Sequence, residues 1–426
     1  MDNMMRNTPP QVVKADKIDY LKPLQYNIGC NMPVYLLKGT SQDVIRIEFV
    51  FRSGSINQKK LLVAQSVANL LRSGTQKRNA EEINHLLDYY GASLQVEAEK
   101  DIISISVACL AKHIRPILGL LIEMVSDAVF PDEEISVFLN NQLQNYIVDM
   151  KTVSHVARVH FNSMIFGENH PYGIFAKEDD FKAVVRDDIT DYYNRFIHPA
   201  NALCIITGSY PNDIIEMLEE NINDYSWRPK ELIDTVWNDP NATTPQKRTI
   251  DMEGKVQSAI RVGKTTINRY HPDYHKLSIT NTLLGGFFGS RLMQNIRQDK
   301  GYTYGIGSGV VSLLHSAYFF ISSQVGKEVC DNTLDEIYKE LRNLRQNPAE
   351  TREMTMLINY LSASFLRSFD GPFSQSGRFR ELVIFGLDYT YYDNYFHTLN
   401  SLKPGDIQST AEQFFHENDM SQIVVG

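Results

Sequence analysis

The sequence has few cysteines, and none of them are paired at a spacing typical of metal or redox chemistry. The 426 residues include only Cys30, Cys109, Cys204 and Cys330, which lie far apart. No two of them form a C-x-x-C pair, the spacing found in zinc knuckles and dithiol redox sites. We therefore expect four structural thiols.

The chain also lacks an excess of positive charge and a long apolar run. Its 42 basic and 51 acidic residues give a formal charge of -9, so nucleic acid and anionic membranes are not expected as partners. The longest apolar runs, such as residues 102–111, are too short to span a bilayer. The opening MDNMMRNTPPQVVKAD has neither the apolar core of a secretion signal nor the composition of a transit peptide. We expect a soluble, cytoplasmic protein.

The length and apolar composition of the chain favour two domains. A chain of 426 residues with 43% apolar composition can bury a large core. Residues 228–248 are rich in Pro, Asn, Asp and Thr without sustained periodicity, which predicts a linker. We expect an N-terminal domain over residues 17–227 and a C-terminal domain over residues 249–426.

The two halves show a similar order of expected elements. Each has a strand, two helices, an alternating strand region and a long helix. These elements cover residues 45–55, 61–75, 80–91, 93–110 and 113–125 in the first half, and 258–267, 275–286, 290–301, 303–325 and 330–344 in the second. This order predicts an α+β fold of two homologous domains, each an antiparallel or mixed sheet covered by helices. We expect the domains to face each other across a cleft.

One expected helix has the outline of a metal site without a metal ligand. The stretch LLVAQSVANLLRSGT, residues 61–75, has apolar residues at three- and four-residue spacing and should end near Gly74. Its polar exceptions, Gln65 and Asn69, lie one turn apart on the same face, with Ala68 between them. A zinc-binding helix would carry His, Glu and His at these places.

Several phrases in the chain resemble the pitrilysin or mitochondrial processing peptidase-like (insulinase-type) family of zinc metallopeptidases. They are NMPVYLLKG, FVFRSGS, Gly74-Thr75, FPDEEI, HPYG at residues 170–173 and the block of residues 283–304, in the order of the family. The resemblance runs from about Lys17 to the end of the chain. It implies two domains of the LuxS/processing-peptidase-like metallohydrolase type. In this family the helix carries an inverted His-x-x-Glu-His signature, in which two His bind zinc and the Glu is the general base.

The resemblance places the zinc positions of this chain on residues that cannot bind zinc well. Counting back from Gly74-Thr75, the degenerate positions are Gln65, Ala68, Asn69 and, in the helix after FPDEEI, Asn145, with Asn141 and Gln144 near it. Neutral amides are poor zinc ligands, and alanine cannot accept a proton from water. We therefore expect no metal, no cofactor and no catalytic residue in the chain alone.

Two His pairs are the alternative places for a metal. His271 and His275 have i,i+4 spacing, but Pro272 marks a helix start, which favours a surface helix cap. His155 and His160 are five apart and do not share a helical face. Neither pair predicts a catalytic site.

A second motif of the family is retained. In LLGGFFGSRLMQNIRQDKGYTYGIGSG, residues 283–309, Arg297 and Tyr304 match an Arg and a Tyr that reach toward the substrate in the family. Both side chains can donate hydrogen bonds to a peptide carbonyl or a developing oxyanion. The alternative is architectural, with Gly301 permitting a turn and the tyrosines packing on the sheet. The resemblance also implies that an extended peptide pairs with the edge strand at residues 93–97, although the family often has Asn-Ala where this chain has Gln95-Val96.

Three hypotheses follow for the function. The first is a non-catalytic subunit that supplies Arg297 and Tyr304 to a heterodimeric peptidase whose zinc is in a homologous partner. The second is a structural or peptide-binding homodimeric scaffold, and the third is a divergent zinc endopeptidase active alone. A co-purifying chain with an intact His-x-x-Glu-His signature would favour the first, and stoichiometric zinc in the isolated chain would favour the third.

Overall fold

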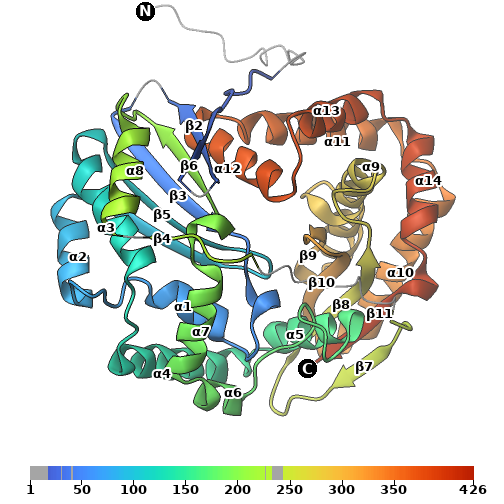
Figure 1. Cartoon of the computed structure of the whole chain (residues 1–426). Coiled ribbons are helices and arrows are strands. Elements are labelled where there is room, and N and C mark those ends of the chain that lie inside the picture. The colour runs from blue at the N-terminus through green and yellow to red at the C-terminus, as the bar shows by residue number, and fades with distance from the viewer. Residues whose placement is uncertain (1–17, 30, 40–41, 226, 233–242) are drawn as a thin grey trace, which may run out of the picture.

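The protein has two lobes, each built on one sheet (Figure 1). The computed structural model describes residues 18–29, 31–39, 42–225, 227–232 and 243–426. The opening segment, Cys30 and the middle of the expected linker, residues 233–242, lie outside the described residues. The α+β class with two similar halves is confirmed.

The first lobe holds a six-stranded mixed sheet with the order β1-β2-β6-β3-β5-β4. Only β2 and β6 pair in parallel, and the other neighbours are antiparallel. The strands are β1 (Leu24–Ile28), β2 (Met32–Lys38), β3 (Val44–Phe51), β4 (Ser93–Ala98), β5 (Ile103–Leu110) and β6 (Ala202–Gly208). Every residue of β6 is buried, as expected for a central strand covered on both faces.

The helices of the first half are α1 (Val63–Leu70), α2 (Ala80–Tyr89), α3 (Ile114–Ser126), α4 (Asp132–Asp149), α5 (Val153–Phe166), α6 (Glu178–Ala183), α7 (Arg186–Phe196) and α8 (Ile214–Asp224). Most of them pack around this sheet and form a large apolar core with it, whereas α5 belongs to another apolar cluster. Local signals explain several boundaries. Asn79, for example, caps α2 by accepting from the Glu82 N–H, and the Glu82 side chain accepts from the Asn79 N–H in return.

The second lobe holds a five-stranded sheet with the order β7-β11-β8-β10-β9. Its strands are β7 (Lys247–Ile250), β8 (Gln257–Thr266), β9 (Thr303–Ser312), β10 (Ala317–Gly326) and β11 (Ser421–Val425). Its helices are α9 (Tyr274–Asn281), α10 (Cys330–Gln346), α11 (Thr351–Arg367), α12 (Gly371–Ile384), α13 (Thr390–Ser401) and α14 (Pro404–Phe414), with π-helical segments at Thr282–Gly286 and Met293–Asp299. None of the helices in the described part of the chain is long and apolar enough to cross a membrane.

The two halves exchange one helix each. Helix α5 of the first half packs on β8 and β11 of the second sheet, while α12 of the second half packs on β6 and β2 of the first (Figure 1). Phe161 of α5 shares an apolar cluster with Ile423, and Phe379 of α12 shares another with Leu203. The predicted boundaries at 17–227 and 249–426 do not capture this exchange, and β7 already begins inside the expected linker. The lobes therefore form one interlocked body in addition to facing each other.

The thiols in the described part of the chain are structural, as expected. Cys109, Cys204 and Cys330 are free and buried. Burial raises the pKa of Cys109 to about 11, so its thiol is protonated and unreactive near neutral pH.

The Gly74-Thr75 phrase belongs to a buried hydrogen-bond network. Thr75 Oγ1 donates to Glu123 Oε1 over 2.6 Å, Tyr225 donates to Glu123 Oε2 over 2.9 Å, and Arg78 forms an ion pair with the same carboxylate. Burial on its own would raise the pKa of Glu123, but these three partners outweigh it and hold the pKa below its ordinary value. The phrase therefore stabilises the fold around a buried charge.

Glu123→Gln is expected to lower the free energy of unfolding at pH 7 by about 2 kcal/mol, because charge-assisted hydrogen bonds are lost. The folded pKa of Glu123 lies below the unfolded value of about 4.3. Its contribution is therefore complete above that value and is lost as the pH falls through the folded pKa. Urea unfolding at several pH values should show the two proteins converging in acid. The exposed Glu219→Gln is the matched control, and a difference that stays constant with pH would contradict the network.

Candidate functional site

The degenerate zinc positions lie on α1, which packs between the edge strand β4 and helix α4. Helix α1 is shorter than the expected 61–75: its last helical residue is Leu70, and Gly74 lies in a turn with a φ of 153°. The helix ends early because Gly74 and Thr75 pair with Asn79 and Ala128 as isolated bridges. Ala68 is fully buried, whereas Gln65 and Asn69 are half-buried.

The amides at these positions hydrogen bond within the protein. Gln65 Nε2 donates to Gln142 Oε1 over 3.3 Å, and Asn69 Nδ2 donates back to the Gln65 carbonyl over 2.8 Å. The residue of α4 that reaches α1 is therefore Gln142. Asn145, like Asn141 and Gln144, is exposed.

The sequence carried a signal for Gln142 that the motif comparison missed. Ile135 and Leu139 of α4 are buried. Gln142 follows them at helical spacing, seven and three residues on, so it shares their face. The positions of the buried residues on α4 therefore locate this contact better than the number of residues counted from the FPDEEI phrase.

The residues present do not fit a zinc ion. The described residues contain no group of three or more His, Cys, Asp or Glu that could hold a metal. His271 Nδ1 accepts from the Asp273 N–H over 3.1 Å, which confirms a helix-start role. The surface location expected for His275 is wrong, because its ring packs 4.4 Å from that of Tyr391, and burial lowers its pKa to about 4.

Treatment with a chelator is expected to change the melting temperature of the chain by less than about 1 °C, since no metal binding is linked to folding. Thermal unfolding with and without EDTA, together with elemental analysis of the purified chain, measures this. One zinc per chain, with a clear loss of stability on its removal, would contradict the expectation.

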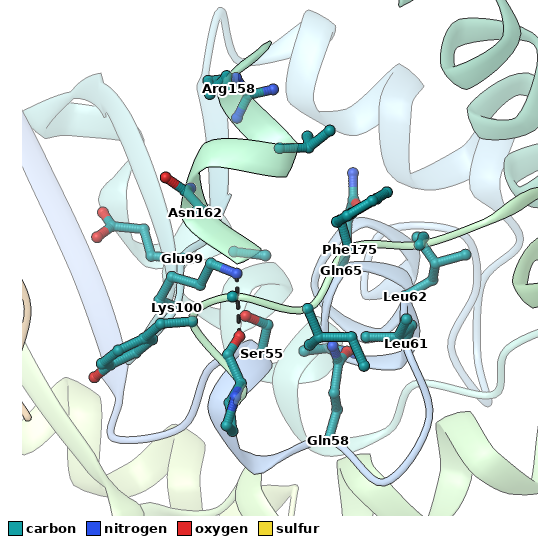
Figure 2. Close-up of a pocket in the computed structure, with 18 residues that line it drawn as sticks. Ser55, Gln58, Leu61, Leu62, Gln65, Glu99, Lys100, Arg158, Asn162 and Phe175 are labelled. Carbon is teal, nitrogen blue, oxygen red and sulfur yellow. Dashed lines mark hydrogen bonds between the residues drawn. The ribbon is translucent and has the colours of Figure 1, made fainter. Parts of the chain in front are cut away.

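A pocket of about 440 Å³ opens beside Gln65 (Figure 2). Its wall is formed by α1 with the segment before it, the β4–β5 turn, α5 and residues 171–176. In this wall Lys100 Nζ donates to the Pro171 carbonyl over 3.2 Å. Burial lowers the pKa of Lys100, because a charged ammonium loses hydration there.

The HPYG phrase shapes this pocket. Tyr172 is buried and hydrogen bonds to Asp101 in the β4–β5 turn. A Cβ atom on Gly173 would lie 2.3 Å from the Gly167 carbonyl oxygen, so only glycine fits there. This part of the resemblance is explained by backbone packing.

Arg297 and Tyr304 lie on the second lobe and are open to solvent to different degrees. Arg297 belongs to the π-helical segment Met293–Asp299, and its guanidinium carbon lies 5.1 Å from the centre of the Phe288 ring. Tyr304 is at the start of β9 and is 93% exposed. Gly301 has a φ of 66°, as the turn requires, but Tyr304 does not pack on the sheet. Packing within the chain therefore does not explain why a tyrosine is at position 304. A role in substrate contact stays a prediction for both residues.

The glycines before Arg297 have a packing role, as the sequence favoured. A Cβ atom on Gly285 would lie 2.7 Å from the backbone nitrogen of Ser308 in β9. The π-helical segment Thr282–Gly286 can approach β9 this closely only without a side chain at that position.

Both sheets end in a strand with one unpaired edge. β4 is the last strand of the first sheet and β9 is the last of the second. The expected edge strand at residues 93–97 is thus confirmed as an edge, because within the described residues Ser93–Ala98 pair with β5 alone. Such an edge can accept main-chain hydrogen bonds from another extended chain.

Comparisons with known proteins find similarity to the M16 peptidases. The model of the "Peptidase M16 inactive domain" matches residues 183–361. The "uncharacterized zinc protease YmxG" of Bacillus subtilis is 20% identical over 358 residues, covering 84% of this chain and 86% of that protein. The "non-peptidase homolog YmxG" of Helicobacter pylori is 22% identical over 291 residues, covering 66% of each.

The fold agrees with these relatives. The crystal structure of the peptidase M16 inactive domain from Pseudomonas fluorescens superposes with a TM-score of 0.87 and 19% identity, covering 95% of this chain and 98% of that one. The matches show that this chain is similar to M16 peptidases and to non-peptidase homologues of them, and it has amides at the positions of the zinc signature.

Proposed function

We propose that this chain is the non-catalytic half of a two-subunit peptidase, in which a homologous subunit supplies the zinc site. The observation that supports this most directly is Tyr304, a phenol that is 93% exposed on an edge strand. Its exposure leaves it no packing role in the chain itself. The amides at Gln65 and Asn69 are poor zinc ligands, so the zinc would have to be bound by the other subunit.

The chemistry of the proposed role is hydrogen-bond donation. A guanidinium and a phenol both donate to oxygen and could bind a peptide carbonyl or stabilise the negative charge that develops on it. The contact with Phe288 restricts Arg297 before a peptide binds, which reduces the entropy lost on binding. The zinc-activated water would come from the partner subunit.

We further propose that the substrate is an extended peptide and that the protein works in the cytoplasm. The unpaired edge of β4 supports strand addition, in which main-chain bonds give affinity without demanding one sequence. The cytoplasm is proposed from the composition of the chain, which has no apolar run long enough to span a bilayer.

The second candidate is a homodimeric scaffold that binds peptides without cleaving them. The same free edge of β4 supports it, because strand addition needs no metal. The third candidate, an endopeptidase active alone, is disfavoured by the donor set of Gln65, Asn69 and Gln142.

Purification of the tagged chain from its native cells at low salt tests the proposal. Mass spectrometry and metal analysis of the eluate should identify a zinc-bearing homologue, and the pair should hydrolyse peptides that neither chain cleaves alone. The scaffold would be favoured if the chain elutes alone or as a homo-oligomer, without metal. It should then also stay inactive when any zinc-bearing homologue from the same cells is added.

A further inference from the structure

We infer that the pocket beside Gln65 binds a carboxylate of the extended peptide, so that this protein selects acidic peptides. The inference rests on the peptide binding proposed above and adds its chemical class. It concerns a pocket of about 440 Å³ on the first lobe, and it involves neither Arg297 nor Tyr304.

The pocket lies where a peptide on β4 would deliver a side chain. Strand β4 ends at Ala98, and the next residues, Glu99 and Lys100, form part of the pocket wall. In an added strand successive side chains point to opposite faces. Every second side chain near the end of β4 would therefore face the side on which α1 packs.

Two cations in the wall have no carboxylate partner within 4.0 Å in the described part of the chain. They are Lys100 from the β4–β5 turn and Arg158 from α5 (Figure 2). The Lys100 ammonium donates once, to Pro171, and has two further protons to donate. Arg158 is exposed, and its Nη2 lies 3.2 Å from the ring nitrogen Nδ1 of His155.

Three partly buried arginines of this protein pair with a carboxylate, whereas the partly buried Lys100 and the exposed Arg158 do not within 4.0 Å in the described residues. Arg291, Arg345 and Arg380 each form an ion pair with a carboxylate. The charged residues of the pocket wall are these two cations and Glu99, so the wall carries more positive than negative groups in a protein with a formal charge of -9.

The acidic residues next to the pocket do not neutralise these cations by direct contact. The carboxylate of Asp101 is occupied, since it accepts from Tyr172 and, over 3.0 Å, from the Leu314 N–H. Glu99 also lines the pocket, but Figure 2 shows its carboxylate directed away from the Lys100 ammonium. Burial raises the pKa of Glu99, and the positive charge of Arg380 lowers it in part.

Amide groups complete the wall. Gln58 Oε1 accepts from the Ala64 N–H over 3.2 Å, which leaves its NH₂ group to donate to a ligand. Asn162 Oδ1 is buried without a hydrogen-bond partner among the described residues. A peptide N–H that reached it after a small side-chain rotation would remove that cost.

Binding of labelled decapeptides to the full chain, measured by fluorescence anisotropy, tests the inference. Each peptide carries Glu, Gln or Lys at one scanned position, with a free or amidated C-terminus. At the best position, the Glu peptide is expected to bind about 10-fold or more tightly than its Gln counterpart, as for a hydrogen-bonded charge. Lys100→Met and Arg158→Gln should each reduce this preference, while the exposed control variants Lys112→Met and Arg352→Gln should keep it.

The arms of the experiment separate the possible results. A preference that survives amidation assigns the pocket to an acidic side chain, and one that needs the free end assigns it to the C-terminal carboxylate; both support the inference. Equal binding of Glu and Gln peptides by the unmodified protein, or a preference unchanged in both pocket variants, overturns it while the proposed function stands. A failure to bind any peptide would overturn the inference together with the peptide binding on which it rests.

Discussion

Arg380→Met is expected to lower the free energy of unfolding by about 3 kcal/mol, because it leaves a buried carboxylate without its main partner. Arg380 lies on α12 and donates to Glu48 Oε1 over 2.8 Å and to Glu97 Oε2 over 3.0 Å. Glu48 is on β3 and only 5% exposed. The ion pair thus connects the exchanged helix of the second half to the sheet of the first. Urea unfolding measures the loss, and amide exchange over residues 371–384 should rise with it.

Two controls distinguish the buried pair from the exposed one. Glu97→Gln should cost less than about 1 kcal/mol, because the Glu97 side chain is 50% exposed and its interaction is screened by water. The double variant Glu48→Gln with Arg380→Met should recover most of the loss, since the buried carboxylate is no longer charged and the remaining Glu97 is exposed to water. If the single and double variants are equally unstable, the ion pair is not what connects α12 to the sheet.

In the proposed two-subunit complex, Arg297→Ala and Tyr304→Phe are each expected to lower kcat/KM on the order of 100-fold. Loss of one donor to a developing oxyanion typically has an effect of this size. The melting temperature of the chain should change by less than about 1 °C for Tyr304→Phe, since a hydroxyl on a side chain that is 93% exposed contributes little to folding. Steady-state kinetics and thermal unfolding on the same preparations measure both effects.

A matched control removes the same hydroxyl elsewhere. Tyr89 is 74% exposed on α2, so Tyr89→Phe should leave both activity and stability unchanged. Arg297→Lys should restore only part of the activity, because an ammonium lacks the planar fork and the stacking on Phe288. Full activity of the Tyr304→Phe complex would contradict the proposed role of the tyrosine.

Local patterns predicted most elements of the fold. The alternation over residues 93–110 gave β4 and β5, and the helical spacing over 80–91 and 330–344 gave α2 and α10. These elements could be predicted because each has a polar and an apolar face, whose period depends only on the local backbone.

The exchange of α5 and α12 could not be predicted in the same way. An apolar helical face indicates that a helix is buried, but it does not indicate which sheet the helix packs on. Helix α5 follows four helices of its own half in the chain, yet it packs on β8 and β11. Such long-range choices depend on the shape of both surfaces at once. The contact of Gln142 with Gln65 was missed for a related reason, because counting residues from a motif ignores the direction of the helical face.

The sequence by itself determined that this chain has no zinc signature, since no fold can turn Gln65, Ala68 and Asn69 into ligands and a base. The sequence also determined that the chain has two similar halves and that Arg297 and Tyr304 are present at the positions of the second motif. Only the tertiary structure decided that Tyr304 is exposed, that Arg380 pairs with Glu48 across the halves, and that Lys100 and Arg158 line the same pocket. These facts join residues distant in the chain, and their energies come from burial and charge, which exist only once the chain is folded.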